Sequence, residues 1–288
     1  MTYADYVGKS ERREDVVRAE AIERLAATLQ CPVPADGALP PLWHWMLFQD
    51  WKTPPELGKD GHPVRGGFLP PVDLPRRVWG GSRIVFHTKL YAGDTATRVS
   101  TVGSVEERAG STGRLVLVTI KHSISAVSGL VISEEQDLVY CEAIKTQSPC
   151  KREAPAPAPA PAEATTETVV PDSTLLFRFS ALTGNAHRIH YDERYARQEE
   201  GYAGIVVHGP LQAILLSNLA ARLSDGRRLA GFRHRGHQPL IAGEPLQMEG
   251  WREGAAVKLR IRDRDGRICT SAEATFDHVP PSAQEGSP

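Results

Sequence analysis

Alternating apolar and polar residues dominate the chain before residue 147. Four runs have the period of two that is typical of strands, and turn residues, Gly93-Asp94 and Gly110-Ser-Thr-Gly113, separate the first of them. These runs span residues 83–90, 96–107, 114–125 and 130–143. The pattern predicts an antiparallel meander.

The same alternation returns after residue 170. Strands are predicted at residues 175–180, 230–235, 245–252, 255–263 and 267–276, and Asp265-Gly266 has the composition of a hairpin turn. An apolar run over residues 211–223 is long enough for a buried helix. Both parts of the chain therefore favour an antiparallel sheet combined with a helix, although strand spacing alone permits other α+β folds.

The N-terminal segment predicts one amphipathic helix. Between residues 14 and 30, Ile22, Leu25, Ala26 and Leu29 recur at helical spacing, and Ser10 is a candidate cap. Residues 49–77 are rich in glycine and proline and predict a long loop, which usually has a functional reason.

A proline-rich stretch separates the two parts. Residues 149–161 read Pro-Cys-Lys-Arg-Glu-Ala-Pro-Ala-Pro-Ala-Pro-Ala-Pro, which can neither form a helix nor pair in a sheet. We therefore expect an N-terminal domain over 1–147, an extended linker over 148–170 and a C-terminal domain over 171–288.

Composition excludes several classes of function. The 288 residues are 41% hydrophobic and 24% charged, as in a globular protein, and the net charge of -1 favours neither nucleic acid nor an anionic membrane as a partner. No signal peptide or membrane span is apparent, so we expect a cytoplasmic protein. The four cysteines lack metal-binding spacing and are expected to be reduced: Cys31, Cys141, Cys150 and Cys269.

Candidate chemistry is concentrated in one C-terminal stretch. Gly184-Asn-Ala-His-Arg-Ile-His190 offers an imidazole whose ordinary pKa suits proton transfer near neutrality. His208-Gly-Pro then opens the apolar helix, whose first backbone N–H groups can stabilise a developing negative charge. A proton-transfer group and an anion-stabilising helix terminus thus come from neighbouring parts of the sequence.

The whole chain resembles one enzyme family. Phe177 to Asp192, together with Asp60-Gly-His-Pro63, Trp79-Gly-Gly81 and Ser133-Glu-Glu-Gln-Asp137, is similar to the MaoC-like hydratases and dehydratases, in the branch of the hydroxyacyl-thioester dehydratases type 2. The resemblance implies an α+β double hot-dog fold, with two long antiparallel sheets each wrapped around a central helix. It also implies an acyl-CoA substrate, no separate cofactor and a homodimer.

The resemblance assigns catalytic roles to three residues. His190 matches the catalytic histidine, and Gly209 matches the position whose N–H points at the thioester oxygen. Asn185 falls where most of the family has a catalytic aspartate. Because an amide cannot accept a proton, Asn185 either orients water or His190 by hydrogen bonding or serves only as a turn residue.

Four further residues are candidates for substrate binding. Arg178 and Arg188 flank the motif and would pair with a second carboxylate on the acyl group. Alternatively, they are surface arginines that form ion pairs with nearby acidic residues. His187 and His208 complete the set, and His187 is also a candidate proton carrier. A metal site is not favoured, because no carboxylate or cysteine has suitable spacing.

The expected activity is a hydratase, a carbon–oxygen lyase that adds water to a short branched dicarboxylic enoyl-CoA such as itaconyl-CoA or mesaconyl-C4-CoA. A 3-hydroxyacyl-thioester dehydratase of fatty-acid metabolism, a hot-dog acyl-CoA thioesterase and a non-catalytic acyl-CoA binding protein are the alternatives. Hydrolysis alone liberates a free thiol, so that measurement separates the thioesterase from the hydratase.

Overall fold

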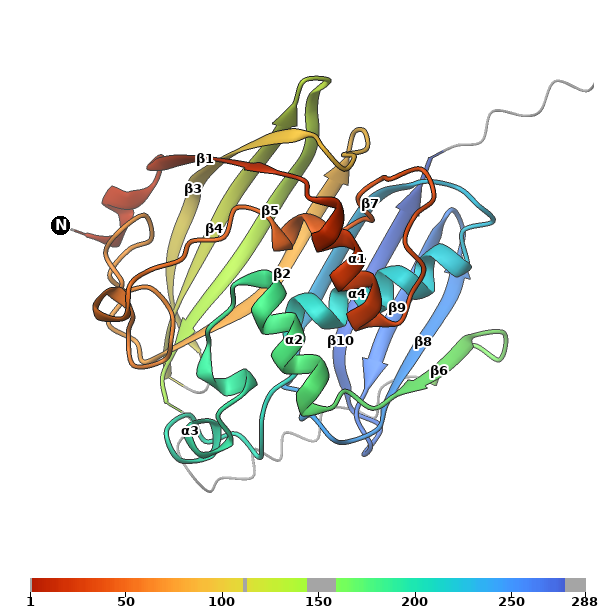
Figure 1. Cartoon of the computed structure of the whole chain (residues 1–288). Helices are drawn as coiled ribbons and strands as arrows, with labels where there is room; N and C mark the ends of the chain where they lie inside the picture. The colour runs from red at the N-terminus through yellow and green to blue at the C-terminus, as the bar shows by residue number, and fades with distance from the viewer. Residues whose placement is uncertain (1, 111–112, 144–158, 278–288) are drawn as a thin grey trace, which may run out of the picture.

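One antiparallel sheet runs through the whole molecule. The computed structural model describes residues 2–110, 113–143 and 159–277, and its strands follow the order β1-β3-β4-β5-β2-β7-β10-β9-β8-β6 (Figure 1). The five N-terminal strands are contiguous in this order, as are the five C-terminal strands, and the two groups meet where β2 lies beside β7. The strands are β1 Ser10–Val16, β2 Arg76–Phe86, β3 Thr95–Gly110, β4 Gly113–Ala126, β5 Gly129–Cys141, β6 Thr165–Val169, β7 Leu229–Gly236, β8 Leu246–Glu253, β9 Ala256–Arg262 and β10 Ile268–Phe276.

Strand β2 joins the two halves. It pairs with β5 on one side and with β7 on the other, in register from Gly81 opposite Arg235 to Val85 opposite Gly231. A side chain at Gly81 would place its Cβ 2.3 Å from the carbonyl oxygen of His234, so only glycine permits this close approach. The two predicted sheets are therefore continuous at their edges.

The helices cover one face of the sheet. Helix α4, Gly209–Arg222, packs against β7, β8, β9 and β10, with Leu211, Ile214 and Leu216 buried (Figure 1). Helix α1, Ala19–Leu29, packs against α2, Ser173–Thr183. Because α1, α2 and α4 contribute to the same apolar cluster, both halves share one core.

The prediction of a strand at residues 175–180 was wrong. These residues lie in α2, which begins after the cap Asp172, whose carboxylate accepts a hydrogen bond from the Leu175 N–H at 2.7 Å. Leu176, Phe179 and Ser180 are buried on one side of this helix. Their spacing of three and four residues is helical, and a short apolar run does not distinguish the two periods.

The prediction of a helix over 14–30 was also wrong at its start. Residues 10–16 form the edge strand β1, paired with β3, so Ser10 begins a strand and does not cap a helix. The helix begins at Ala19, and Ile22, Leu25 and Ala26 are buried as predicted. Five charged residues in β1 conceal its alternation from a hydrophobicity pattern.

The predicted linker extends too far. Residues 165–169 at its C-terminal end form β6, which pairs with β8 and so belongs to the sheet. Residues 148–158 of the linker, with Cys150, lie outside the described residues. The other three cysteines form no disulfide within the described residues.

Candidate active site

A cavity of about 670 Å³ lies where the two halves meet. The C-terminal half contributes Asn185, His187, His190 and Gly209 to its lining, so all three predicted catalytic residues come together there. The N-terminal half contributes residues of β2 and of the long loop: His62, Arg76, Arg77, Val78 and Trp79. Neither half alone encloses the site.

A tight turn presents the Gly184 to His190 motif to the cavity. Helix α2 ends at Thr183, its C-cap Gly184 has φ +62°, and the Asn185 N–H donates to the carbonyl of Ser180 at 2.9 Å. The side-chain oxygen of Asn185 accepts a hydrogen bond from the His187 N–H at 3.0 Å. A 3-10 turn, η4 Arg188–His190, follows. Asn185 therefore stabilises the turn and also lines the cavity, so its two possible roles are compatible.

His190 has the geometry of a neutral base. Its Nδ1 lies 2.7 Å from the carbonyl oxygen of Val206, which can only accept, so Nδ1 carries the proton. Within the described residues Nε2 has no hydrogen-bond partner, and this atom is not completely buried. Its lone pair is therefore accessible from the cavity. Burial lowers the pKa of His190 to about 3, despite the opposing effect of the Val206 hydrogen bond.

His187 is tied to a buried carboxylate. Its Nε2 lies 3.0 Å from Oε1 of Glu200, which is only 7% exposed. Glu200 in turn lies 3.7 Å from Nε of Arg76, and Arg76 also donates to the hydroxyl of Tyr202. His187 is therefore held in place by a network that β2 and the C-terminal half share.

Gly209 combines a close contact with a helix terminus. A Cβ at this position would lie 2.5 Å from Cε3 of Trp79, so a side chain has no room. As the first residue of α4, Gly209 has a backbone N–H without a partner inside the helix, at the positive end of the helix dipole. An oxygen that gains negative charge in the cavity would be stabilised there.

His208 does not line the cavity, contrary to its predicted role in substrate binding. It is completely buried, stacks on His190 with 3.6 Å between ring centroids, and its Nε2 lies 2.8 Å from the hydroxyl of Ser180. It therefore supports the ring of His190 from behind.

Arg178 and Arg188 also lie outside the cavity lining, so the predicted carboxylate-binding pair is not there. Arg178 is exposed on α2, because the helical period turns it away from the buried face. Arg188 pairs with Asp192 at 2.7 Å and donates to the carbonyl of Lys59 at 3.0 Å. The arginines that line the cavity are Arg76, Arg77 and Arg98.

The long loop contributes residues that the motif did not reveal. Asp60 and His62 lie beside His187, with 4.3 Å between the ring centroids of the two histidines. Asp60, His62 and His187 each offer a ligand atom within 4.8 Å of the others, so this group has the composition to hold a metal ion. Two features of the sequence pointed to these residues: the unusual length of the loop and the segment Asp60-Gly-His-Pro63, which is part of the family resemblance.

A second buried polar cluster lies at the N-terminal end of the cavity. Glu134 accepts hydrogen bonds from Trp45 Nε1 at 3.1 Å and from the Ser82 hydroxyl at 2.7 Å, and lies 3.1 Å from Nε2 of His44. Burial alone would raise the pKa of Glu134, but the contacts with His44 and Ser82 and the charge of His122 together outweigh it and lower the pKa to about 2. A buried carboxylate with this many partners connects β5, β2 and the segment before the long loop.

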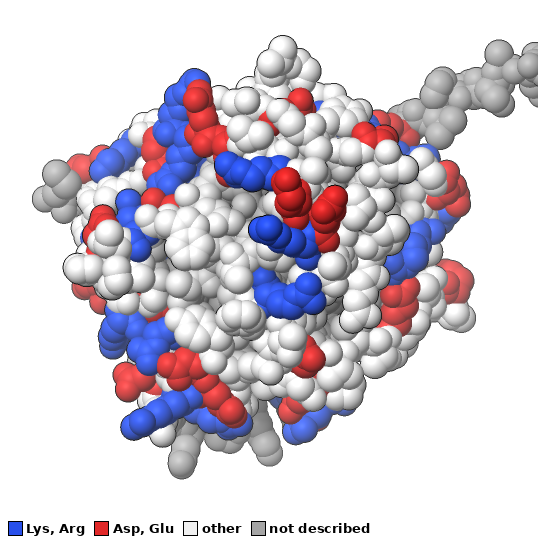
Figure 2. Space-filling view, in the orientation of Figure 1, with Lys and Arg blue, Asp and Glu red and all other residues white. Residues whose placement is uncertain are grey.

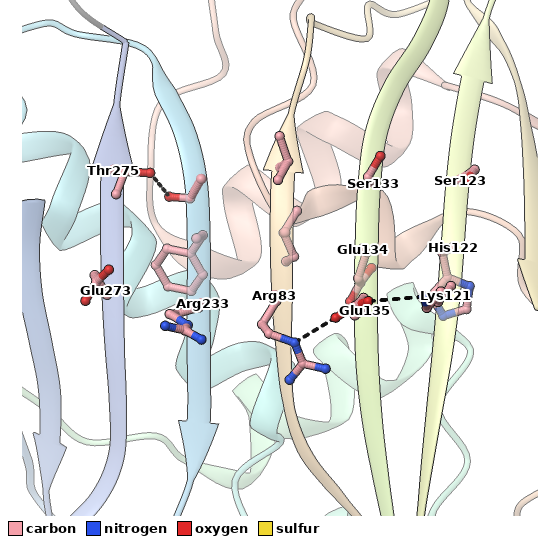
Figure 3. A pocket seen from close by; sticks show the side chains of 14 residues that line it. Arg83, Lys121, His122, Ser123, Ser133, Glu134, Glu135, Arg233, Glu273 and Thr275 are labelled. Atoms are coloured by element: carbon pink, nitrogen blue, oxygen red, sulfur yellow. Dashed lines mark hydrogen bonds and ion pairs between the residues drawn. The ribbon is translucent and has the colours of Figure 1, made fainter. Parts of the chain in front are cut away.

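Charge elsewhere on the molecule is mixed. Acidic and basic residues are interspersed over the face in Figure 2. A depression of about 510 Å³ on the sheet face away from the helices is lined by charges that pair with one another, such as Arg83 with Glu135 at 3.0 Å (Figure 3). It lacks a helix terminus and an open histidine, so the cavity between the halves is the better candidate site. No helix within the described residues is long and apolar enough to cross a membrane.

Comparison with known proteins gives one consistent result. Residues 42–242 match the family "hydroxyacyl-thioester dehydratase type 2". A mesaconyl-C(4)-CoA hydratase from Chloroflexus aurantiacus is 44% identical over 94% of this chain and 98% of its own length. Among solved structures, a MaoC-like dehydratase from Phytophthora capsici has a TM-score of 0.68 at 16% identity, covering 96% of this chain and 98% of that one.

The predicted fold class is confirmed. A Mycobacterium tuberculosis protein described as having a double hot-dog fold matches with a TM-score of 0.57 at 12% identity, over 95% of this chain and 97% of that one. The long antiparallel sheet with its helices on one face agrees with this description (Figure 1).

Proposed function

We propose that this chain, which belongs to the hydroxyacyl-thioester dehydratase type 2 family, adds water to the double bond of a short, branched, dicarboxylic enoyl-CoA such as mesaconyl-C4-CoA. It is a carbon–oxygen lyase of the hydratase and dehydratase type. The observation that carries the proposal is the cavity in which an open histidine nitrogen, at His190, and a helix N-terminus, at Gly209, occur together.

The chemistry follows from these two groups. Neutral His190 takes a proton from water as the hydroxyl attacks the β-carbon, because its Nδ1 proton is held by Val206 and its Nε2 lone pair is free. The electrons of the double bond move to the thioester oxygen, where the N–H of Gly209 stabilises the enolate. The imidazolium of His190 then returns the proton to the α-carbon, which completes the addition of water.

The acyl carboxylate needs a cation in the cavity. The side chain of Arg77 forms no ion pair or hydrogen bond with the described residues, and Arg77 lines the cavity. After burial, its charge is the next cause that lowers the pKa of His62, which also lines the cavity. Arg76, by contrast, is already engaged by Glu200 and Tyr202. Arg77 is therefore the best candidate partner for an ionised acyl group.

One observation favours a second candidate function. The cavity also has an apolar part, to which Phe68, Leu69, Ile120, Ile124 and Leu138 contribute. A neutral acyl chain would bury its surface there. The alternative is therefore a 3-hydroxyacyl-thioester dehydratase with a longer, uncharged substrate.

A substrate comparison tests the activity. Loss of enoyl-thioester absorbance without release of a free thiol is expected with mesaconyl-C4-CoA or itaconyl-CoA, together with the mass of one added water. His190→Ala should lower turnover by at least ~100-fold. The exposed His87, bonded to Ser133, gives the control His87→Ala, which should keep wild-type turnover. Thiol release, or wild-type turnover by folded His190→Ala, would reject the proposal.

The choice of acyl group is tested by a second pair of variants. Arg77→Met should reduce the preference for mesaconyl-C4-CoA over crotonyl-CoA by about one to two powers of ten, since a charge-assisted contact contributes roughly 1.5 to 3 kcal/mol. Arg178→Met, which removes an exposed arginine outside the cavity, is the matched control. If both variants keep the wild-type preference for mesaconyl-C4-CoA over crotonyl-CoA, the result favours the dehydratase with an uncharged acyl chain.

We also propose that the reaction needs no cofactor besides the coenzyme A of its substrate, and that the protein is a cytoplasmic homodimer. Light scattering after size-exclusion chromatography measures the oligomeric state. Turnover after dialysis against a chelator tests the cofactor expectation.

A further inference from the structure

The loop that carries Asp60 and His62 is docked on the catalytic turn. Gly61 has φ +87°, and a Cβ there would lie 2.0 Å from the carbonyl oxygen of Ala186. The N–H of Arg188 donates to the carbonyl of Asp60 at 2.9 Å. Backbone contact this close holds the N-terminal loop and the C-terminal motif as one unit.

Within this loop, Asp60 fixes the orientation of His62. One carboxylate oxygen accepts the backbone N–H of His62 at 3.0 Å, and the other lies 3.2 Å from its Nδ1. An ionised carboxylate accepts only, so the Nδ1 of His62 carries a proton and its Nε2 carries a lone pair.

The Nε2 of His62 is open to the same cavity as that of His190. His62 lines the cavity. Its Nε2 has no hydrogen-bond partner among the described residues and is not completely buried. The rings of both histidines contact that of His187, with centroid distances of 4.3 Å and 5.5 Å. His44 and His208 differ, because the Nδ1 of each is completely buried and has no hydrogen-bond partner among the described residues.

We propose that His62 is a further catalytic residue, which holds the attacking water together with His190, and that Asp60 is its positioning residue. The proposal rests on the proposed hydration. Water has two hydrogens and attacks through an oxygen lone pair, so two acceptors are needed to aim it. His190 removes one hydrogen as a proton and returns it to the α-carbon. The other stays hydrogen-bonded to His62 and remains on the product hydroxyl.

This arrangement explains why an amide suffices at position 185. Asn185 cannot take a proton, and its side-chain oxygen already accepts the N–H of His187. The second acceptor for water is supplied instead by His62, from a loop more than a hundred residues away in the sequence.

A pair of variants of similar size tests the role of His62. His62→Gln keeps an acceptor oxygen and His62→Leu removes it. We expect His62→Leu to lower kcat by about 10- to 100-fold, because misplacing a reactant has effects of that order, while KM changes by less than about threefold. His62→Gln should be clearly more active than His62→Leu. Equal activity of the two folded variants, or a change confined to KM, would overturn the proposal.

Chemical rescue separates a catalytic role of His62 from a structural one, because free imidazole should restore turnover only if the ring acts on the water. His62→Ala leaves space for a free imidazole, which should restore part of the turnover, whereas His87→Ala should show no response. If His62→Ala fails to fold, the glutamine and leucine pair still decides. Asp60→Asn should lower kcat, because it removes the charge that orients the ring of His62. The fall should be smaller than in His62→Leu, because the imidazole itself is retained. An Asp60→Asn variant more impaired than His62→Leu would contradict its positioning role.

Two other outcomes are distinguishable. If the wild-type protein hydrates none of the enoyl-CoA substrates, the proposed function fails before His62 is tested. If a chelator abolishes wild-type turnover and Zn²⁺ alone restores it, the group Asp60, His62 and His187 binds a metal, and the hydrogen-bonding role of His62 is rejected.

Discussion

The two nitrogens of His190 have different tasks, and the difference comes from one backbone carbonyl. The carbonyl oxygen of Val206 accepts a hydrogen bond from the Nδ1–H of His190 at 2.7 Å and so fixes the tautomer. The stacked ring of His208 holds the imidazole plane. Both contacts favour a neutral ring whose Nε2 faces the cavity, which is the state required of a base.

The lowered pKa of His190 predicts an unusual pH profile. A pKa of about 3 means that the ring stays neutral as the pH falls from neutrality to about 4, so the base form is retained in weak acid. We expect kcat/KM at about pH 5 to be within about twofold of its value at pH 7. A base with the ordinary pKa of about 6.5 would lose about 25-fold of its neutral form over that interval. Steady-state kinetics, with circular dichroism as a control for folding, measures the difference.

Gly209 predicts a coupled pair of substitutions. Gly209→Ala would push a methyl group into Trp79, and we expect a loss of about 1 to 3 kcal/mol in the free energy of unfolding, with at least ~10-fold lower turnover. Combining it with Trp79→Leu removes the clash. The double variant should therefore be more stable than the sum of the two single changes predicts. Additive changes in chemical denaturation would contradict the contact.

The residues that line the candidate site could be predicted to the extent that they are local in sequence. Asn185, His190 and Gly209 belong to one continuous stretch, and each lines the cavity. His62 and Arg77 could not be assigned, because only the docking of the loop and of β2 brings them to the motif. Arg178 was misplaced because its helix was mistaken for a strand.

The docked loop gives Arg188 a role other than the predicted binding of substrate. Its backbone N–H and its guanidinium donate to the carbonyls of Asp60 and Lys59, so it holds the loop that carries His62. Its ion pair with Asp192 is half-exposed and contributes little to stability.

Arg188→Ala therefore has a predictable signature. We expect turnover of mesaconyl-C4-CoA and crotonyl-CoA to fall by a similar factor, about 3- to 10-fold, because the loop loosens while the backbone contact remains. The ratio of the two specificity constants should stay within about twofold of the wild-type ratio. A selective loss with the dicarboxylic substrate would instead return Arg188 to the acyl-binding site.

The strands of the sheet were predicted well where alternation is strong. All four N-terminal runs and the last four C-terminal runs correspond to β2 to β5 and β7 to β10, with shifts at their ends. Strand β1 was missed because its residues are mostly charged, and β6 because it follows a proline-rich stretch. Edge strands bury little apolar surface, so tertiary pairing decides them more than pattern does.

The whole molecule depends on the join between β2 and β7. The predicted division into two domains remains a useful description of the sequence, but the cavity takes residues from both halves and the apolar core is shared. The alternation of residues gave no information on this join, because it predicts strands and not the order in which they pair. The halves are therefore expected to unfold together.

Glu134 provides a test of this shared structure. It is buried in β5 and accepts hydrogen bonds from Ser82 in the joining strand β2 and from Trp45. Its pKa of about 2 when folded lies below the value of about 4.5 expected when unfolded. A depressed carboxyl pKa contributes stability above the unfolded value, and this contribution is lost as the pH falls from about 4.5 through 2. It amounts to up to about 3 kcal/mol.

Glu134→Gln should therefore lower Tm at neutral pH and flatten the decrease of Tm between about pH 5 and pH 3, because the variant has no carboxylate to protonate at this position. The adjacent Glu135, whose side chain is 43% exposed on the opposite face, gives the matched control Glu135→Gln, which should keep the wild-type slope. Because Glu134 binds β2, destabilisation should spread to the C-terminal half, and hydrogen exchange should increase in β7 as well as in β5. Faster exchange confined to β5 would mean that the halves are less tightly joined than the continuous sheet implies.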